Sequence, residues 1–336
     1  MKFLLFLSLS VFLINISEAQ TIAAADLKTL KAKEDSMITF SKLIVEGRSP
    51  EECLRADSIF TKILVRALKV KNSYYYSFDS LSYISRIAPQ DKAFKIFTWQ
   101  VALDENSVRQ HGAIQMKTAD GSLKLFPLID KSDVIEQMDT VTNNLNWIGA
   151  VYYKIIETKD FNNKPVYTLL GYDENNIRSN KKFIEVLTFV NGEPVFGGSY
   201  FSYPTSSLRK KFVNRYVMEY KKNAAPRLTF DNEQNMIIYE HLISETNEPQ
   251  KKYTYIPDGD YEGMKWINGK WVYVEKVFTF KLNDGEAPVP SPIKENNGSW
   301  ESTNFAIEDD GDDINLQPKK VKTKTKTATV KNKKKP

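Results

Sequence analysis

The 336-residue sequence has a single cysteine, Cys53, and only two histidines, His111 and His241. One thiol excludes an internal disulfide framework, so the core must be held together by packing alone. Neither histidine has a second His or Cys at metal-ligand spacing, so no local motif indicates a zinc site. Cys53 shares an apolar helical face with Ala56 and Phe60, which favours a buried structural thiol.

The sequence also lacks the motifs by which common enzyme classes are recognised. It has no Gly-x-Ser-x-Gly nucleophile elbow, no Walker phosphate loop and no dinucleotide-binding glycine pattern. We therefore assign no catalytic residue, no cofactor and no metal from motifs, and whether the chain is an enzyme stays open. After Gln20 no run reaches the roughly eighteen apolar residues of a membrane span, so the mature chain is expected to have no transmembrane segment.

The chain begins with the pattern of a secretory signal peptide. In "MKFLLFLSLSVFLINISEAQ", Lys2 gives a positive start and an apolar run of about a dozen residues follows. Ser17 and Ala19 are small residues at the positions that a signal peptidase reads. We predict a signal peptide over residues 1–19, with a retained N-terminal anchor as the alternative, and a periplasmic or extracellular location.

Excess positive charge is confined to the C-terminal end. The whole chain carries +5, but the last eighteen residues contain nine Lys and no acid, and residues 20–318 have 37 basic and 41 acidic groups, or −4. The charge of the domain therefore gives no argument for nucleic-acid binding. Residues 284–336, acidic at "EDDGDD" and then Lys-rich, predict a disordered tail. This tail is either a solubilising segment or an electrostatic tether to an anionic envelope surface.

Residues 20–88 predict a helical segment. Residues 22–46 have apolar side chains at helical spacing, and "RSPEEC" follows. In this motif Ser49 and Glu52 form a capping box, and the proline between them suits a first helical position. Two helices joined by a short link are expected to form an antiparallel hairpin. A third, shorter helix is predicted around residues 79–87.

From residue 89 to residue 283 the pattern changes to short runs rich in β-branched and aromatic residues, such as "AFKIFTWQVAL" and "KKFIEVLTFV". Residues 230–236 predict a chain reversal, and residues 132–144 predict a helix. Three dipeptides are strong hairpin signals: Asp120-Gly121, Asn191-Gly192 and Asn268-Gly269. The expected fold class is α+β, with an N-terminal helical hairpin, a predominantly antiparallel β domain forming a curved sheet or open barrel, and the tail.

One polar loop is the best candidate for chemistry. "LLGYDENNIRSNKKF" (169–183) lies between two strong strand patterns, and loops on rigid sheets often carry function. Asp173 and Glu174 could supply acid–base chemistry, and Arg178 could bind an anion. A solvated hairpin loop is the alternative. Separately, four tryptophans could line a sugar-binding face or lie in the core: Trp99, Trp147, Trp266 and Trp271.

The stretch "YIPDGDYEGMKWINGKWVYV" begins like a calcium loop, because Asp258, Asp260 and Glu262 are two residues apart. The twelfth position, which should be a bidentate Glu, is Gly269, and the flanks look like strands rather than helices. We interpret the stretch as two reversals around a short strand, with a weak cation site as the alternative.

Several blocks, among them "AFKIFTWQVALDEN", "YYKIIETK" and "YIPDGDYEGMKWINGKWVYV", resemble recurring blocks in exported proteins of Bacteroidota that have no assigned function. The resemblance covers about residues 79–277 and implies a bacterial periplasmic or secreted setting, but no site residue. The sequence thus favours a non-enzymatic binding module for a small molecule, a glycan or an envelope protein. A hydrolase with a polar site on the loops of the β domain is the alternative.

Overall fold

The computed structural model describes residues 21–104, 106–204 and 213–278, with two short segments, 293–294 and 300–301. The predicted signal peptide (1–19) and nearly all of the predicted tail (284–336) lie outside the described residues. The chain divides into a unit that ends at residue 279 and a second one that follows it. In the second, β16 (Ile293–Lys294) pairs antiparallel with β17 (Trp300–Glu301). In the part that the structure describes, no helix has the length and apolar character needed to cross a membrane.

The N-terminal helical hairpin is confirmed, with α1 (Ala24–Glu46) and α2 (Pro50–Leu68). The capping box is present as well: Ser49 Oγ accepts the Glu52 N–H at 3.3 Å, and the Glu52 carboxylate accepts the Arg48 N–H at 2.7 Å. Gly47 in the link is required by close approach, because a Cβ there would lie 2.7 Å from Cys53 Sγ. Cys53 is buried and unpaired, as expected for a structural thiol.

Three antiparallel sheets follow the helices. The first has the order β1 (Ser85–Ile87), β2 (Phe94–Ala102), β3 (Val108–Met116), β4 (Lys124–Ile129). The second has the order β5 (Thr142–Asn143), β9 (Glu193–Phe196), β8 (Ser179–Val190), β7 (Pro165–Asp173), β6 (Val151–Lys159), and β11 (Arg215–Lys221) also pairs with β8. The third has the order β10 (Phe201–Ser202), β15 (Lys270–Val274), β14 (Tyr255–Ile267), β13 (Met236–Ser244), β12 (Leu228–Asp231), with β10 parallel to β15.

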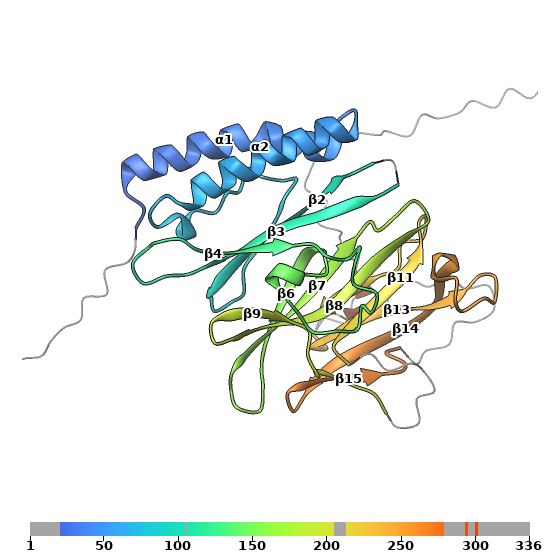
Figure 1. The fold of residues 1–336 in the computed structure, drawn as a ribbon. Helices are drawn as coiled ribbons and strands as arrows, with labels where there is room; N and C mark the ends of the chain where they lie inside the picture. The colour runs from blue at the N-terminus through green and yellow to red at the C-terminus, as the bar shows by residue number, and fades with distance from the viewer. Residues whose placement is uncertain (1–20, 105, 205–212, 279–292, 295–299, 302–336) are drawn as a thin grey trace, which may run out of the picture. The chain divides into compact units, whose positions relative to one another are not determined.

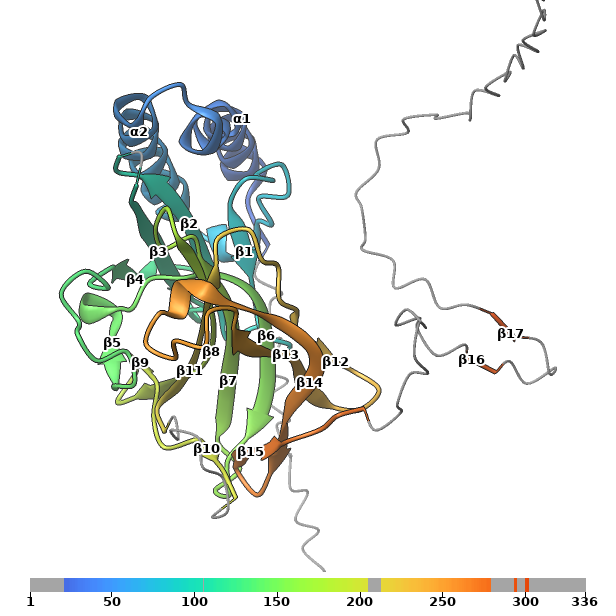
Figure 2. The same cartoon turned by 90° about the vertical axis from the view of Figure 1, so that its right-hand side faces the viewer.

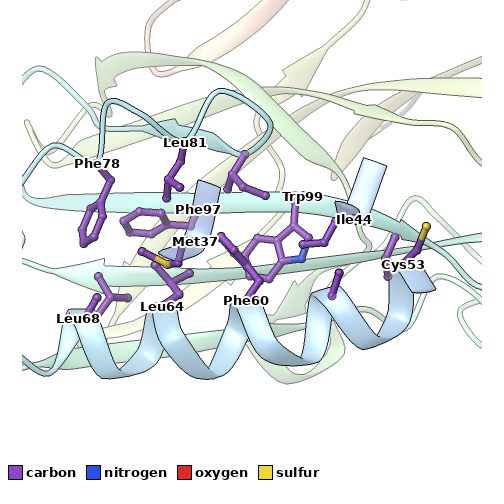
Figure 3. Close-up of a cluster of buried hydrophobic side chains, with 14 of the residues drawn as sticks. Met37, Ile44, Cys53, Phe60, Leu64, Leu68, Phe78, Leu81, Phe97 and Trp99 are labelled. Carbon is purple, nitrogen blue, oxygen red and sulfur yellow. The ribbon is translucent and has the colours of Figure 1, made fainter. Parts of the chain in front are cut away.

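Within the first unit these elements stack as four layers, with the helices over the first sheet, then the second sheet, then the third (Figures 1 and 2). Three apolar cores separate the layers. Phe60, Leu64 and Trp99 belong to the core between the helices and the first sheet, shown in Figure 3. Phe94 and Phe183 belong to the core between the first two sheets. A third core lies between the second and third sheets, so the middle sheet is apolar on both faces.

The structure confirms the α+β class and the predominantly antiparallel β domain. The dipeptides at Asn191 and Asn268 each form a hairpin turn, whereas Asp120 and Gly121 lie in a longer connection, residues 117–123, between β3 and β4; residues 230–236 reverse between β12 and β13. The strands are divided among three sheets, a division that the alternation of apolar residues in a single strand does not specify.

The short helix predicted around residues 79–87 is wrong. Residues 85–87 form β1, which pairs with β2 and extends the first sheet, and the preceding turn is held by the Arg86 guanidinium, which donates to the carbonyl oxygen of Ser77 at 3.1 Å and to that of Phe78. Three single-turn 3₁₀ helices occur elsewhere: η1 (Ser73–Tyr75), η2 (Asn144–Asn146) and η3 (Lys252–Thr254). For residues 85–87, pairing with β2 outweighs the local helical propensity.

The helix predicted over residues 132–144 is also wrong, because distant groups bind this segment. The Asp139 carboxylate accepts the backbone N–H groups of Val213 and Asn214, the latter at 2.7 Å. The Arg215 guanidinium donates to the carbonyl oxygens of Met138 and Thr140 at 2.7 and 2.8 Å. Carbonyl groups that a helix would bond internally are thus taken by β11.

Arg215 also forms a fully buried ion pair with Glu185, and both side chains have no exposed surface. Nε and Nη2 of Arg215 donate to Glu185 Oε2 at 2.8 and 2.7 Å. The other carboxylate oxygen accepts the Tyr152 hydroxyl, which in turn accepts the Trp147 indole N–H at 2.7 Å. The polar groups of this network are therefore hydrogen-bonded although they lie in an apolar core.

The reversal predicted at Asp258 is wrong. β14 runs through it without turning, as one strand from Tyr255 to Ile267. The pairing with β13 shifts between Glu240 and Leu242, so a β-bulge at residues 258–260 lies opposite His241. Gly259, at a φ of +91°, lies in this bulge, so its positive φ serves the bulge rather than a hairpin turn.

Candidate functional site

The first candidate group is a histidine whose ring is fixed by a carboxylate. His111 lies on the face of β3 that is turned toward the helices, and its Nδ1 atom is 2.8 Å from Oδ1 of Asp57 on α2. The indole N–H of Trp99 donates to the same oxygen at 2.7 Å. Asp57 is buried, whereas His111 is partly exposed. This geometry favours the proton on Nδ1 and leaves Nε2 of the neutral ring as an acceptor.

His111 opens onto a cavity of about 210 Å³. The cavity lies at the end of β3 and β4, and its lining residues are Arg109, His111, Leu128, Ile129, Asp130, Lys131 and Asp133. Within the described part of the chain, neither His111 Nε2 nor the Lys131 ammonium has a hydrogen-bond partner. Arg109 forms a partly exposed ion pair with Asp133, with 3.5 Å between Nη2 and the carboxylate.

Asp130 shapes the wall of this cavity. Its carboxylate accepts the backbone N–H groups of Gln110 at 3.0 Å and Gly149 at 3.2 Å, and both the N–H and the hydroxyl of Ser132. A Cβ at Gly149 would lie 2.6 Å from Asp130 Cγ, so only glycine allows this approach. With Asp130 satisfied internally, the groups that remain for a ligand are His111 Nε2, Lys131 and the Arg109–Asp133 pair.

The two carboxylates singled out in the polar loop lie next to each other but have different partners. Asp173, at the end of β7, is buried and accepts the Gln110 amide and the Asn175 N–H. Burial raises the pKa of Asp173 to about 6, against the lowering effect of those donors and of Lys181. Glu174 is more exposed and accepts Gln100 Nε2 at 2.8 Å and Lys222 Nζ at 3.1 Å. Neither residue lines any of the three cavities described for this chain.

The structure does not bring Arg178 to these carboxylates as an anion clamp. Its guanidinium lies over the Tyr253 ring, 4.3 Å from the ring centroid, in a cation–π contact. Lys181 stands opposite Asp173 in the pairing of β7 with β8. The polar side chains of the loop between β7 and β8 therefore contact different neighbours: β2 and β3, the residue after β11, and η3. This is the pattern of a structural hairpin loop.

The tryptophans do not form one sugar-binding face. Trp99, Trp147 and Trp271 are buried in three different cores, and only Trp266 is partly exposed. The buried Trp271 donates its indole N–H to Thr168 Oγ1 at 2.8 Å. These rings stabilise the layers of the fold.

The second histidine has a similar carboxylate partner. The bulge in β14 places Asp258 Oδ2 2.6 Å from His241 Nδ1, and Glu262 Oε1 lies 4.0 Å from Nε2. In the residues that the structure describes, no group of three or more His, Cys, Asp and Glu residues is arranged to hold a metal ion. His241 lines none of the three cavities, which distinguishes it from His111.

Sequence reasoning missed both His–Asp pairs because the partners are 54 and 17 residues apart. One signal for the first pair was present: Asp57 is a charged residue beside Ala56 and Phe60 on a helix face that is otherwise apolar. A carboxylate in such a position requires a buried donor.

No protein-family model, no curated protein and no solved structure matches this chain. The function is therefore inferred from the geometry of the chain's own residues.

Proposed function

We propose that the chain is an exported cell-envelope protein, periplasmic or extracellular, whose β domain is a non-enzymatic binding module. Its ligand is a small molecule, or the end of a glycan, that carries a carboxylate, and it binds in the cavity beside His111. The Lys-rich tail adds contact with an anionic envelope surface. The single observation that carries the proposal is an imidazole fixed by Asp57 with Nε2 unpartnered in a cavity beside Lys131 and Arg109.

The chemistry of the lining residues favours a carboxylate. Lys131 and Arg109 supply positive charge, and Asp133 supplies an acceptor for a neighbouring hydroxyl or ammonium group. Charge-assisted hydrogen bonds of this kind give both affinity and orientation. At about 210 Å³ the cavity is smaller than a typical drug-sized site, which suits a sugar acid, an amino acid or one terminal residue of a longer glycan.

Binding is favoured over catalysis by a hydroxyl or thiol nucleophile, because none of the seven lining side chains carries either group. A hydrolase is the second candidate, and one observation favours it. The Asp57–His111 pair has the arrangement in which a carboxylate orients a general base, and Nε2 could accept a proton from a water molecule in the cavity.

The test uses the two histidines of the chain as a matched pair. We would first identify bound mass by native mass spectrometry of protein purified from its own host. Glucuronate, galacturonate and glutamate would then be titrated while the imidazole NMR signals are followed. We expect the His111 signals to shift and the His241 signals to stay unchanged.

The variants His111→Gln and Lys131→Met should bind about ten- to a hundredfold more weakly, because the first removes the Nε2 acceptor for a ligand hydroxyl or ammonium group and the second removes a charge-assisted contact with the carboxylate. His241→Gln is the matched control and should bind as the wild type does. Equal effects of His111→Gln and His241→Gln, or no shift at His111 with any carboxylate, would sink the binding proposal. Turnover of ester, glycoside or phosphoester substrates that is lost only in His111→Gln would favour the hydrolase.

A further inference from the structure

A second surface of the chain, independent of the cavity, is formed by two hairpin turns. We call residues 159–164 and 265–270 the hairpin-tip surface. Phe161, in the turn between β6 and β7, is 86% exposed. Ile267, at the turn between β14 and β15, is also exposed. Large apolar side chains that are exposed together mark an interaction site more often than single ones do.

The two turns are in contact although they belong to different sheets. Trp266 Nε1 donates to the carbonyl oxygen of Lys159 at 3.1 Å. A Cβ at Gly269 would lie 3.3 Å from the backbone N of Phe161, so the turns touch at this glycine. Phe161 and Ile267 therefore belong to one continuous surface, held in place by both sheets.

Amphipathic aromatic rings lie directly behind the exposed side chains. Trp266 stacks on Tyr200, with 6.4 Å between ring centroids and 21° between ring planes. It also meets the buried Trp271 edge to face at 5.2 Å. Both Trp266 and Tyr200 are partly exposed. Trp and Tyr are the residues that favour the boundary between the apolar interior of a membrane and water.

The charges around the tips are positive. Exposed lysines occupy the ends of both turns, at positions 159, 164, 265 and 270. Asp160 is the single acid in these two segments, and its Oδ1 accepts the backbone N–H groups of Asn162 and Lys164, both at 2.8 Å. The tips thus carry a net charge of +3, whereas residues 20–318 as a whole carry −4.

We propose that the hairpin-tip surface docks on an anionic lipid bilayer. Phe161 enters the acyl region, Trp266 and Tyr200 lie at headgroup depth, and the four lysines contact lipid phosphates. Charge complementarity and the exposed apolar tip support this partner. A stable protein interface takes about 20–30 residues per side, and the two turns together have twelve. None of the three described cavities lies at the tips.

The test measures sedimentation of the mature full-length protein with vesicles of equal parts phosphatidylglycerol and phosphatidylethanolamine, and with phosphatidylcholine vesicles as the neutral reference. Phe161→Ala should weaken partitioning about tenfold or more, because one inserted aromatic side chain is lost. Replacing Lys159 and Lys270 by Gln should weaken binding about fivefold per lysine at low salt. Val134→Ala shortens an apolar side chain that is 67% exposed on another part of the surface, and it should not change partitioning.

The tail must be separated from the tips. In a chain whose nine lysines from Lys319 onward are replaced by Gln, Phe161→Ala should still reduce partitioning by the same factor. Phe161→Trp should retain binding and be quenched by brominated lipid more strongly than the wild type, whose five native tryptophans give the background signal. The proposal is overturned if the wild type does not bind the anionic vesicles, if Phe161→Ala binds equally well, or if binding depends on the tail alone. It is equally overturned if Phe161→Ala abolishes a dimer or binding of a soluble glycan instead.

Discussion

The most informative stability test is the removal of Glu185. Its carboxylate lies with the Arg215 guanidinium in the core between the first two sheets, and neither side chain has exposed surface. The five N–H groups of Arg215 are divided among Glu185, the carbonyls of Met138 and Thr140, and the hydroxyl of Thr142. Glu185→Ala would leave a buried positive charge with only part of its partners.

The size of the loss follows from the groups left behind. Glu185→Ala removes the acceptor for the Nε and one Nη2 proton of Arg215 and for the Tyr152 hydroxyl. Breaking a buried pair by deleting one partner lowers the free energy of unfolding by about 3–5 kcal/mol. With a urea slope of about 3 kcal/mol per molar, the unfolding midpoint should fall by about 1–1.7 M.

Urea unfolding followed by tryptophan fluorescence measures this loss. Lys221→Ala is the matched control, because Lys221 lies on β11, the strand of Arg215, and pairs with Glu245 at 2.6 Å, with side chains 42% and 46% exposed. We expect less than about 1 kcal/mol for that exposed pair. The combined variant Glu185→Leu and Arg215→Met should be more stable than Glu185→Ala, since it leaves no buried charge. The reasoning is refuted if Glu185→Ala and Lys221→Ala lose equal stability.

Two further predictions concern single side chains. The raised pKa of Asp173, about 6, means that the folded chain holds an extra proton between about pH 4 and 6, so stability falls as pH rises through this range. Asp173→Asn should therefore unfold at a higher urea concentration than the wild type at pH 7, with a free energy of unfolding larger by up to about 3 kcal/mol. This difference should disappear at pH 4, and a difference that does not depend on pH would contradict the prediction. Ser49→Ala removes the N-cap of α2 and should lower stability by about 1 kcal/mol in thermal unfolding, whereas Ser36→Ala, at an exposed hydroxyl inside α1, should be nearly neutral.

The features that the sequence predicts correctly depend on neighbours in the chain. The N-cap at Ser49 and the turns at Asn191 and Asn268 are set by residues within a few positions of each other. The same applies to the buried face around Cys53, which follows from helical spacing. Local rules of this kind hold because no distant group competes for the same backbone atoms.

The predictions that were wrong concern segments that bind another strand instead of forming the local structure expected of them. Residues 132–144 lose their helix to β11, and residues 79–87 lose theirs to β2. The expected reversal at Asp258 is absent because β13 pairs along both sides of the bulge. The candidate site also depends on residues far apart in the sequence, because the Asp57 carboxylate on α2 meets His111 on β3. In the sequence, only the charge of Asp57 on an apolar helix face indicated this pair.

The middle sheet has a consequence for the order in which the chain is made. Its two apolar faces are covered by layers that lie on either side of it in the sequence: the first sheet precedes it, and β12 to β15 follow it. As the chain lengthens, one face can be covered at once, while the other is covered only as β12 to β15 are made, and β15 ends at Val274. A chain shortened before that strand therefore exposes the very surface that promotes aggregation. Completion of the β14–β15 hairpin thus covers this surface and prevents self-association through it.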